Sequence, residues 1–112
     1  MNKKDIFPTL KKEKDKKYPF VDTYEYKGHY FYIEPIYKVQ FNRVSERFPS
    51  EVETLKNLML ERVSTYGTVV FTGDFTSPLV DEEEFTYVEI DDLLCELNLP
   101  IEDKSRGSDY GD

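Results

Sequence analysis

Residues 50–67, SEVETLKNLMLERVSTYG, contain the clearest secondary-structure signal in the chain and predict its main helix. Ser50 and Glu53 have the spacing of a capping box, in which the serine caps the first turn and the glutamate reaches back to it. Gly67 ends the pattern, because glycine readily adopts the backbone conformation that follows a helix. The apolar residues recur at intervals of three and four and form one stripe that faces a core, namely Val52, Leu55, Leu58, Met59, Val63 and Tyr66.

Downstream of this helix, two more strands and a short helix are expected. Residues 68–72 and 85–90 are rich in β-branched and aromatic side chains, which favour strands. Asp91 and Asp92 then offer an N-cap and a first-turn carboxylate to a short leucine-rich helix, which Pro100 stops.

Upstream, residues 20–33 predict a hairpin with Gly28 and His29 in its turn. The return strand resumes after Pro35, which suits an edge or a bulge, as residues 36–41. Pairing Lys27 with Tyr30 assigns each side chain to a face. The expected core face carries Phe20, Tyr24, Tyr26, Phe31, Ile33 and Tyr37, and the other face carries Thr23, Glu25, Lys27, Tyr30, Tyr32 and Glu34.

Together these elements predict an α+β fold, in which an antiparallel sheet of about four strands in ββαββα order packs against one main helix and a short C-terminal helix. Residues 20–101 form the single domain. Residues 1–19 are expected to be a basic, flexible arm, because Pro8 and Pro19 interrupt any helix and lysines dominate. Residues 102–112 are polar and predict a disordered acidic tail.

Composition places the chain among small globular proteins. Its 112 residues are 38% hydrophobic and 15% aromatic, and disordered chains are poor in aromatics. Cys95 is alone, so no intrachain disulfide forms. No apolar run approaches the ~18 residues of a membrane span, and the N-terminal lysines precede no apolar core of a secretory signal. We therefore expect a cytoplasmic protein that has no contact with membranes.

The charge is distributed unevenly along the chain. Residues 1–19 hold seven lysines against three acidic residues, whereas the remaining residues hold eight basic against twenty acidic side chains. Thirteen of those acidic residues lie in residues 74–112, against two basic ones. An acidic body repels nucleic acid and attracts basic proteins. The lysine arm contains no arginine to read bases, so we expect no direct binding of nucleic acid.

No motif for catalysis, metal or cofactor binding emerges, so we expect a protein that is not an enzyme. His29 is the only histidine and lies in a predicted turn, and Cys95 is expected to be a buried thiol beside Leu94 and Leu97. One cysteine and one histidine do not make a structural zinc site. The acidic run at residues 81–84 lacks the alternating ligands and central glycine of an EF-hand.

The leading hypothesis is a non-enzymatic acidic inhibitor or regulator that occupies a basic, DNA-binding type of site on a partner protein by imitating DNA. Carboxylates on alternate strand residues lie about 6.5–7 Å apart and can present a row of negative charge. Small acidic inhibitors of this size and charge occur in phages and mobile elements. The candidate residues for this surface are Asp74, Asp81, Glu82, Glu83, Glu84, Glu89, Asp91, Asp92 and Glu96.

The alternative hypothesis is a small accessory or immunity-type protein that binds its partner through the tyrosine-rich hairpin, with acidity incidental. Its candidate residues are Glu25, Tyr30, Tyr32 and Glu34, since exposed tyrosines suit protein interfaces. This face has a second interpretation, in which the C-terminal helix covers it and it is ordinary core. The sequence does not fix the oligomeric state and is compatible with a dimer.

Overall fold

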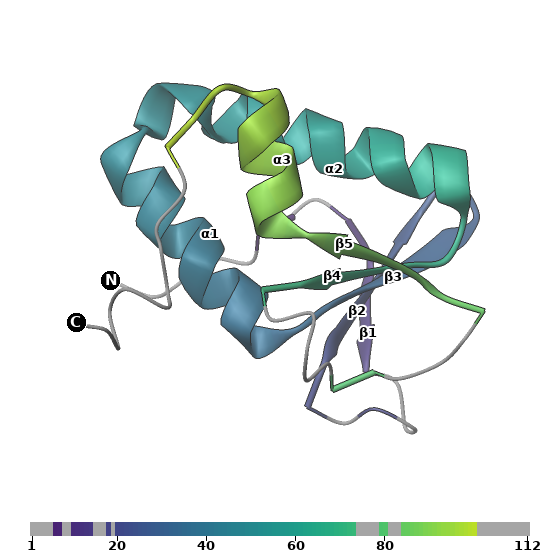
Figure 1. Cartoon of the computed structure of the whole chain (residues 1–112). Helices are drawn as coiled ribbons and strands as arrows, with labels where there is room; N and C mark the ends of the chain where they lie inside the picture. The colour runs from purple at the N-terminus through teal and green to yellow at the C-terminus, as the bar shows by residue number, and fades with distance from the viewer. Residues whose placement is uncertain are drawn as a thin grey trace.

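The computed structural model describes residues 6–7, 10–14, 18, 20–73, 79–80 and 84–100. The protein is α+β, as predicted, with a sheet and three helices (Figure 1). In chain order the elements are β1 (Lys12–Lys14), β2 (Asp22–Tyr26), β3 (His29–Ile33), α1 (Pro35–Arg47), the short 3-10 helix η1 (Pro49–Glu51), α2 (Val52–Tyr66), β4 (Val69–Thr72), β5 (Thr86–Glu89) and α3 (Ile90–Glu96).

The sheet is mixed, so the prediction of a purely antiparallel sheet is wrong. Its strands lie in the order β1-β2-β3-β4-β5. β2 pairs antiparallel with both β1 and β3, and β4 and β5 run parallel to β3. Parallel neighbours need a crossover connection, which α1 and α2 supply between β3 and β4. Figure 1 shows the three helices together on one side of the sheet.

The prediction of a strand at residues 36–41 is also wrong, because these residues belong to α1. Pro35 occupies the first turn of this helix, where its fixed φ and missing N–H are tolerated. The buried residues of α1 follow helical spacing, as a helix on a core requires, and are Tyr37, Gln40, Phe41 and Val44. The ββαββα order therefore holds only roughly, since two long helices stand between the hairpin and β4.

The main helix forms as predicted, except at its start and at Tyr66, which was expected to face the core and is exposed. Residues 49–51 make the 3-10 turn, and α2 begins at Val52 without a side-chain cap hydrogen bond, so the predicted capping box at Ser50 is wrong. Gly67 is the C-cap residue with φ of 86°, a conformation that glycine adopts without strain.

The hairpin turn lies one residue earlier than predicted. Tyr26 pairs with His29, and both turn residues, Lys27 and Gly28, have positive φ, as in a type I′ turn. Tyr24 therefore lies opposite Phe31 instead of Ile33. This changes each pairing by two residues, and side chains alternate with a period of two, so every strand residue keeps its predicted face.

Two apolar clusters lie on opposite faces of the sheet. The helix-side core contains Tyr24, Phe31 and Ile33, as predicted, together with strand residues of β4 and β5 and the buried faces of the helices. The smaller cluster, here called the loop-side cluster, contains Val21, Tyr32, Val70 and Val80, with Tyr18, Phe85 and Tyr87 packed against it. Phe20 was predicted in the core and is 79% exposed, because it precedes β2.

The described part of the predicted arm joins the fold. Lys12–Lys14 form β1, which pairs with β2 as the outer strand of the sheet. Phe7 is buried, and its ring centroid lies 6.0 Å from that of Tyr24 and 5.6 Å from that of Phe31. Lysines are common on edge strands, where they discourage further pairing. This explains why a strand here carries no apolar pattern.

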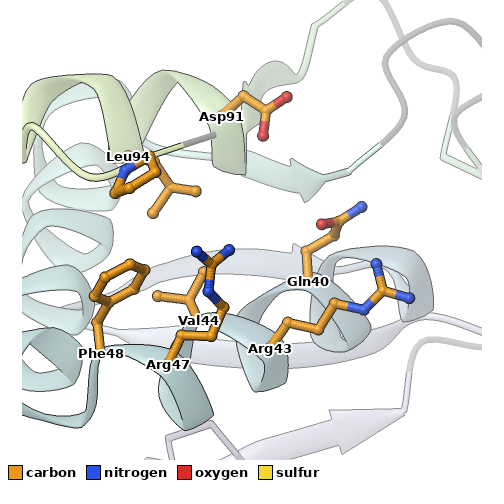
Figure 2. Close-up of a pocket in the computed structure, with 8 residues that line it drawn as sticks. Gln40, Arg43, Val44, Arg47, Phe48, Asp91 and Leu94 are labelled. Atoms are coloured by element: carbon orange, nitrogen blue, oxygen red, sulfur yellow. The ribbon is translucent and has the colours of Figure 1, made fainter. Parts of the chain in front are cut away.

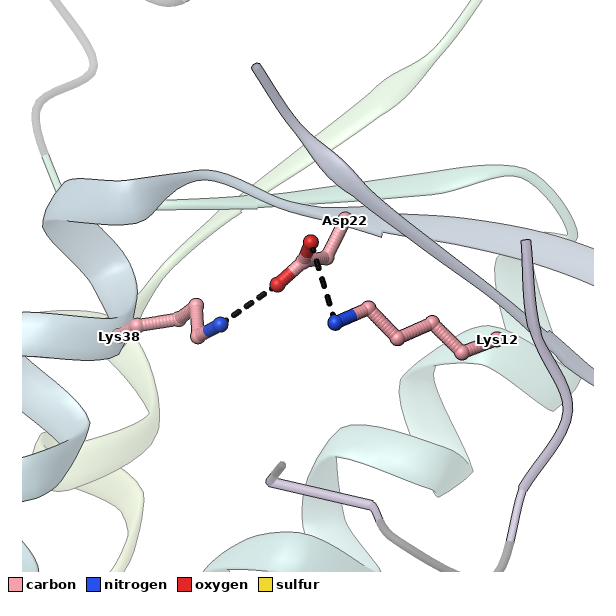
Figure 3. Close-up of polar contacts among 3 residues, drawn as sticks. All are labelled: Lys12, Asp22 and Lys38. Atoms are coloured by element: carbon pink, nitrogen blue, oxygen red, sulfur yellow. Dashed lines mark hydrogen bonds and ion pairs between the residues drawn. The ribbon is translucent and has the colours of Figure 1, made fainter. Parts of the chain in front are cut away.

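An ion-pair cluster ties β1 and α1 to β2 (Figure 3). Asp22 accepts a hydrogen bond from the Lys38 ammonium at 2.5 Å, and Lys12 Nζ lies 3.5 Å from its other carboxylate oxygen. Partial burial acts to raise the pKa of Asp22. The hydrogen bonds and charges of Lys38 and Lys12 outweigh this effect, so the pKa of Asp22 is lowered from its ordinary value.

Acid is therefore expected to weaken the fold through Asp22. Because its pKa is depressed in the folded state, its contribution to stability is complete above the ordinary value of 3.8 and is lost as the pH falls through the lower folded-state pKa. Urea unfolding at a series of pH values between about 2 and 6 measures this dependence. Asp22→Asn should make the free energy of unfolding less dependent on pH below about pH 4. Glu25→Gln, on the opposite face of β2, should leave this dependence unchanged. Parallel profiles for the wild type and Asp22→Asn would contradict the assignment.

Candidate functional site

Five carboxylates lie on the last strand, on the last helix and in the turn just before that strand. Residues 84–100 contain no lysine or arginine, and β5 is the outermost strand on its side of the sheet. Glu84, Asp92 and Glu96 are exposed, and Glu89 and Asp91 are half-buried. These five residues are called the acidic edge below. The four other predicted residues of this surface, Asp74, Asp81, Glu82 and Glu83, lie outside the described residues.

Helix α3 holds three of these carboxylates in fixed directions. It buries Ile90, Leu93 and Leu94 against the sheet and the other helices. Asp92 and Glu96 are four residues apart and therefore share the solvent side of the helix. Asp91 and Asp92 lie in the first turn, where the helix dipole favours negative charge.

A pocket of about 420 Å³ opens between α2, α3 and β5. Arg62 and Tyr66 of α2 form one wall, and Arg62 makes an ion pair with Glu96 across it. Asp92 makes no ion pair within the described part of the chain. The residues that line the pocket are Arg62, Tyr66, Thr86, Tyr87, Val88, Asp92, Cys95 and Glu96.

Asp91 faces a different neighbour. It lies across a narrow hollow of about 10 Å³ from α1, where Gln40, Arg43 and Arg47 are opposite to it (Figure 2). The acidic edge is thus divided between the two sides of α3. Asp92 and Glu96 line the pocket beside β5, whereas Asp91 lies close to two arginines.

The hairpin face differs from its prediction. Glu25 is half-buried and Tyr30 is 45% exposed, but Tyr32 and Glu34 are only 8% and 1% exposed, so their expected place on the surface is wrong. The ring centroid of Tyr32 lies 5.3 Å from that of Phe85 and 5.9 Å from that of Tyr18. Loop residues, and not the C-terminal helix, cover this face.

Glu34 joins the loop to the sheet. Its carboxylate accepts hydrogen bonds from the Thr72 hydroxyl at 2.8 Å and from the backbone N–H groups of Leu79 and Val80 at 2.7 and 3.0 Å. A buried carboxylate with three donors is a structural group that fixes the crossover between β4 and β5.

Cys95 was predicted to be buried and is exposed. Leu93 and Leu94 take the buried positions of α3, which leaves Cys95 on the pocket wall. His29 is half-buried at the start of β3, opposite Tyr26, and so is not in the turn.

Within the described ranges, no three histidine, cysteine, aspartate or glutamate side chains gather closely enough to hold a metal ion. No helix in the same part of the chain has the length and apolar content to cross a membrane. Comparison with known protein families, curated proteins and solved structures finds no match to this chain.

Proposed function

We propose that this protein is a non-enzymatic binding protein, an inhibitor or regulator, whose acidic edge occupies a basic site on a partner protein. One observation carries the proposal: residues 84–100, which contain the outer strand β5, the turn before it and the helix after it, hold five carboxylates and no cationic side chain. Attraction between such an edge and a basic site raises the association rate and weakens as salt increases.

A DNA-binding site is one such basic site, and carboxylates would then occupy the positions of phosphates. Glu84, Glu89 and Asp92 are the described candidates for this imitation, because Glu96 is already paired with Arg62. Asp91 is not among them, because it faces the hollow that Arg43 and Arg47 also line. The alternative interface on the hairpin is less favoured, since burial of Tyr32 and Glu34 removes half of its residues from the surface.

The test is capture of proteins from a lysate of the source cell at about 50 and 300 mM salt. The wild type is expected to retain basic proteins at low salt only, and a DNA duplex is expected to displace them. The double variant Glu84→Lys/Asp92→Lys should lose them, because it reverses charge on the acidic edge.

The matched control is Glu46→Lys/Glu53→Lys, which changes the net charge by the same amount at exposed positions on α1 and α2. It is expected to retain the partners. Equal loss in the two double variants would show that only net charge matters, and retention of acidic or neutral proteins alone would overturn the proposal.

A further inference from the structure

Within the described part of the chain, the outer side of β5 has no strand beside it. The Thr86 N–H donates to the Thr68 carbonyl at 3.1 Å, which points it toward β4. Backbone groups of successive strand residues point to opposite sides, so the Glu89 N–H points away from β4. β5 is the last strand of the described sheet, and nothing in the described part of the chain pairs with its outer side.

The two edges of the sheet are protected differently. β1 carries lysines, which discourage another strand from pairing. β5 has the sequence TYVE, with two β-branched residues and an aromatic one and with neither lysine nor proline. An edge of this composition accepts an added strand from a suitable partner.

The pocket beside β5 determines which side chains such a strand needs. Alternate side chains of an added strand point to the helix side of the sheet, which is the side of Asp92 and Glu96. Glu96 is already paired with Arg62, whereas Asp92 forms no ion pair with any residue that the structure describes. Tyr66, which is 53% exposed, adds a ring face on which a cation can rest.

We infer that β5 is a docking strand for an extended basic segment of the partner. The segment pairs with the outer backbone of β5 and places a lysine or arginine side chain in the pocket against Asp92. This inference rests on the proposed function and specifies how the acidic edge binds.

The probe is a synthetic hexapeptide of alternating lysine and valine, titrated into the isotope-labelled full chain and followed by NMR. The amides of Thr86–Glu89 are expected to shift, and hydrogen exchange at the Glu89 amide is expected to slow. The matched glutamate–valine hexapeptide should bind at least about tenfold more weakly than the lysine peptide. The Asp92→Lys variant should lose affinity for the lysine peptide by a similar factor.

Two variants of one residue separate backbone pairing from charge. Glu89→Pro deletes the outward N–H, and its φ of −85° is close to that of proline. Glu89→Ala removes the same carboxylate and keeps the N–H. The proline variant is expected to bind the lysine peptide at least about fivefold more weakly than the alanine variant, since it alone loses a hydrogen bond.

Equal affinity of the two variants would overturn the inference. If Glu89→Pro does not fold, the wild type still decides: hydrogen exchange at its Glu89 amide that does not slow when the lysine peptide is added also overturns the inference. Self-association through β5 without peptide binding also overturns it, because the occupant is then a second copy. Salt-dependent binding of the peptide without any change at β5 would reject the docking strand and leave the proposed function standing. Failure of the capture experiment with the acidic edge would reject the proposed function itself.

Discussion

Replacing Phe31 by alanine is expected to lower the free energy of unfolding by about 3–5 kcal/mol. Phe31 lies in β3, in the middle of the sheet, and is fully buried. Its ring centroid is 5.6 Å from that of Phe7, 5.4 Å from that of Tyr24 and 5.7 Å from that of Phe71. The contacts with Phe7 and Phe71 are edge-on, a geometry that stabilises beyond area burial alone.

Tyr30→Ala is the matched control for this substitution. Tyr30 is the preceding residue of β3, points to the opposite face and is 45% exposed. Truncating the Tyr30 side chain should lower the free energy of unfolding by less than about 1 kcal/mol. Urea denaturation followed by circular dichroism measures both values. Similar losses of stability for Phe31→Ala and Tyr30→Ala would contradict the assignment of faces. Phe31→Ala should strongly weaken the fold, because a typical domain is stable by only about 5–15 kcal/mol.

The sequence predicted those parts of the fold that depend on local periodicity. The three- and four-residue spacing of Val52, Leu55, Met59 and Val63 identified α2. Alternation identified the faces of the hairpin, even though its turn was misplaced by one residue. Alternation has a period of two, so the error in register did not exchange core and surface.

The parts that the sequence did not predict depend on contacts between distant segments. The segment after Pro35 is short of leucine and contains β-branched residues, so it looked like a strand, although tertiary packing of Tyr37 and Phe41 makes it α1. The parallel pairing of β4 with β3 follows from that helix, because the chain returns to the same end of the sheet.

The candidate site was predicted only as a list of acidic residues. Their run is visible in the sequence, but its division between two sides of α3 is set by where α1 and α2 pack. The pocket residues Arg62 and Tyr66 were missed, since a helix pattern does not show which strand lies beside it. The one local signal was the position of Arg62 next to the buried Val63, on the border of the apolar stripe.

Replacing Glu34 by alanine is expected to lower the free energy of unfolding by about 3 kcal/mol. The substitution leaves three donors without their acceptor, namely the hydroxyl of Thr72 and the backbone N–H groups of Leu79 and Val80. Val80 is fully buried in the loop-side cluster, where water does not readily replace the carboxylate. The loss should therefore loosen the crossover that positions β5 next to β4.

Two comparisons make this prediction specific to the hydrogen bonds. Glu34→Gln keeps the size of the side chain and one acceptor oxygen. Its free energy of unfolding should therefore lie between those of the wild type and Glu34→Ala. Glu25→Ala removes a half-buried glutamate from β2 and should cost less than about 1 kcal/mol. Hydrogen exchange at the Val80 amide should accelerate in Glu34→Ala and not in Glu25→Ala. Equal stability of the two alanine variants would show that the carboxylate does not hold the crossover, and the position of β5 would then need another cause.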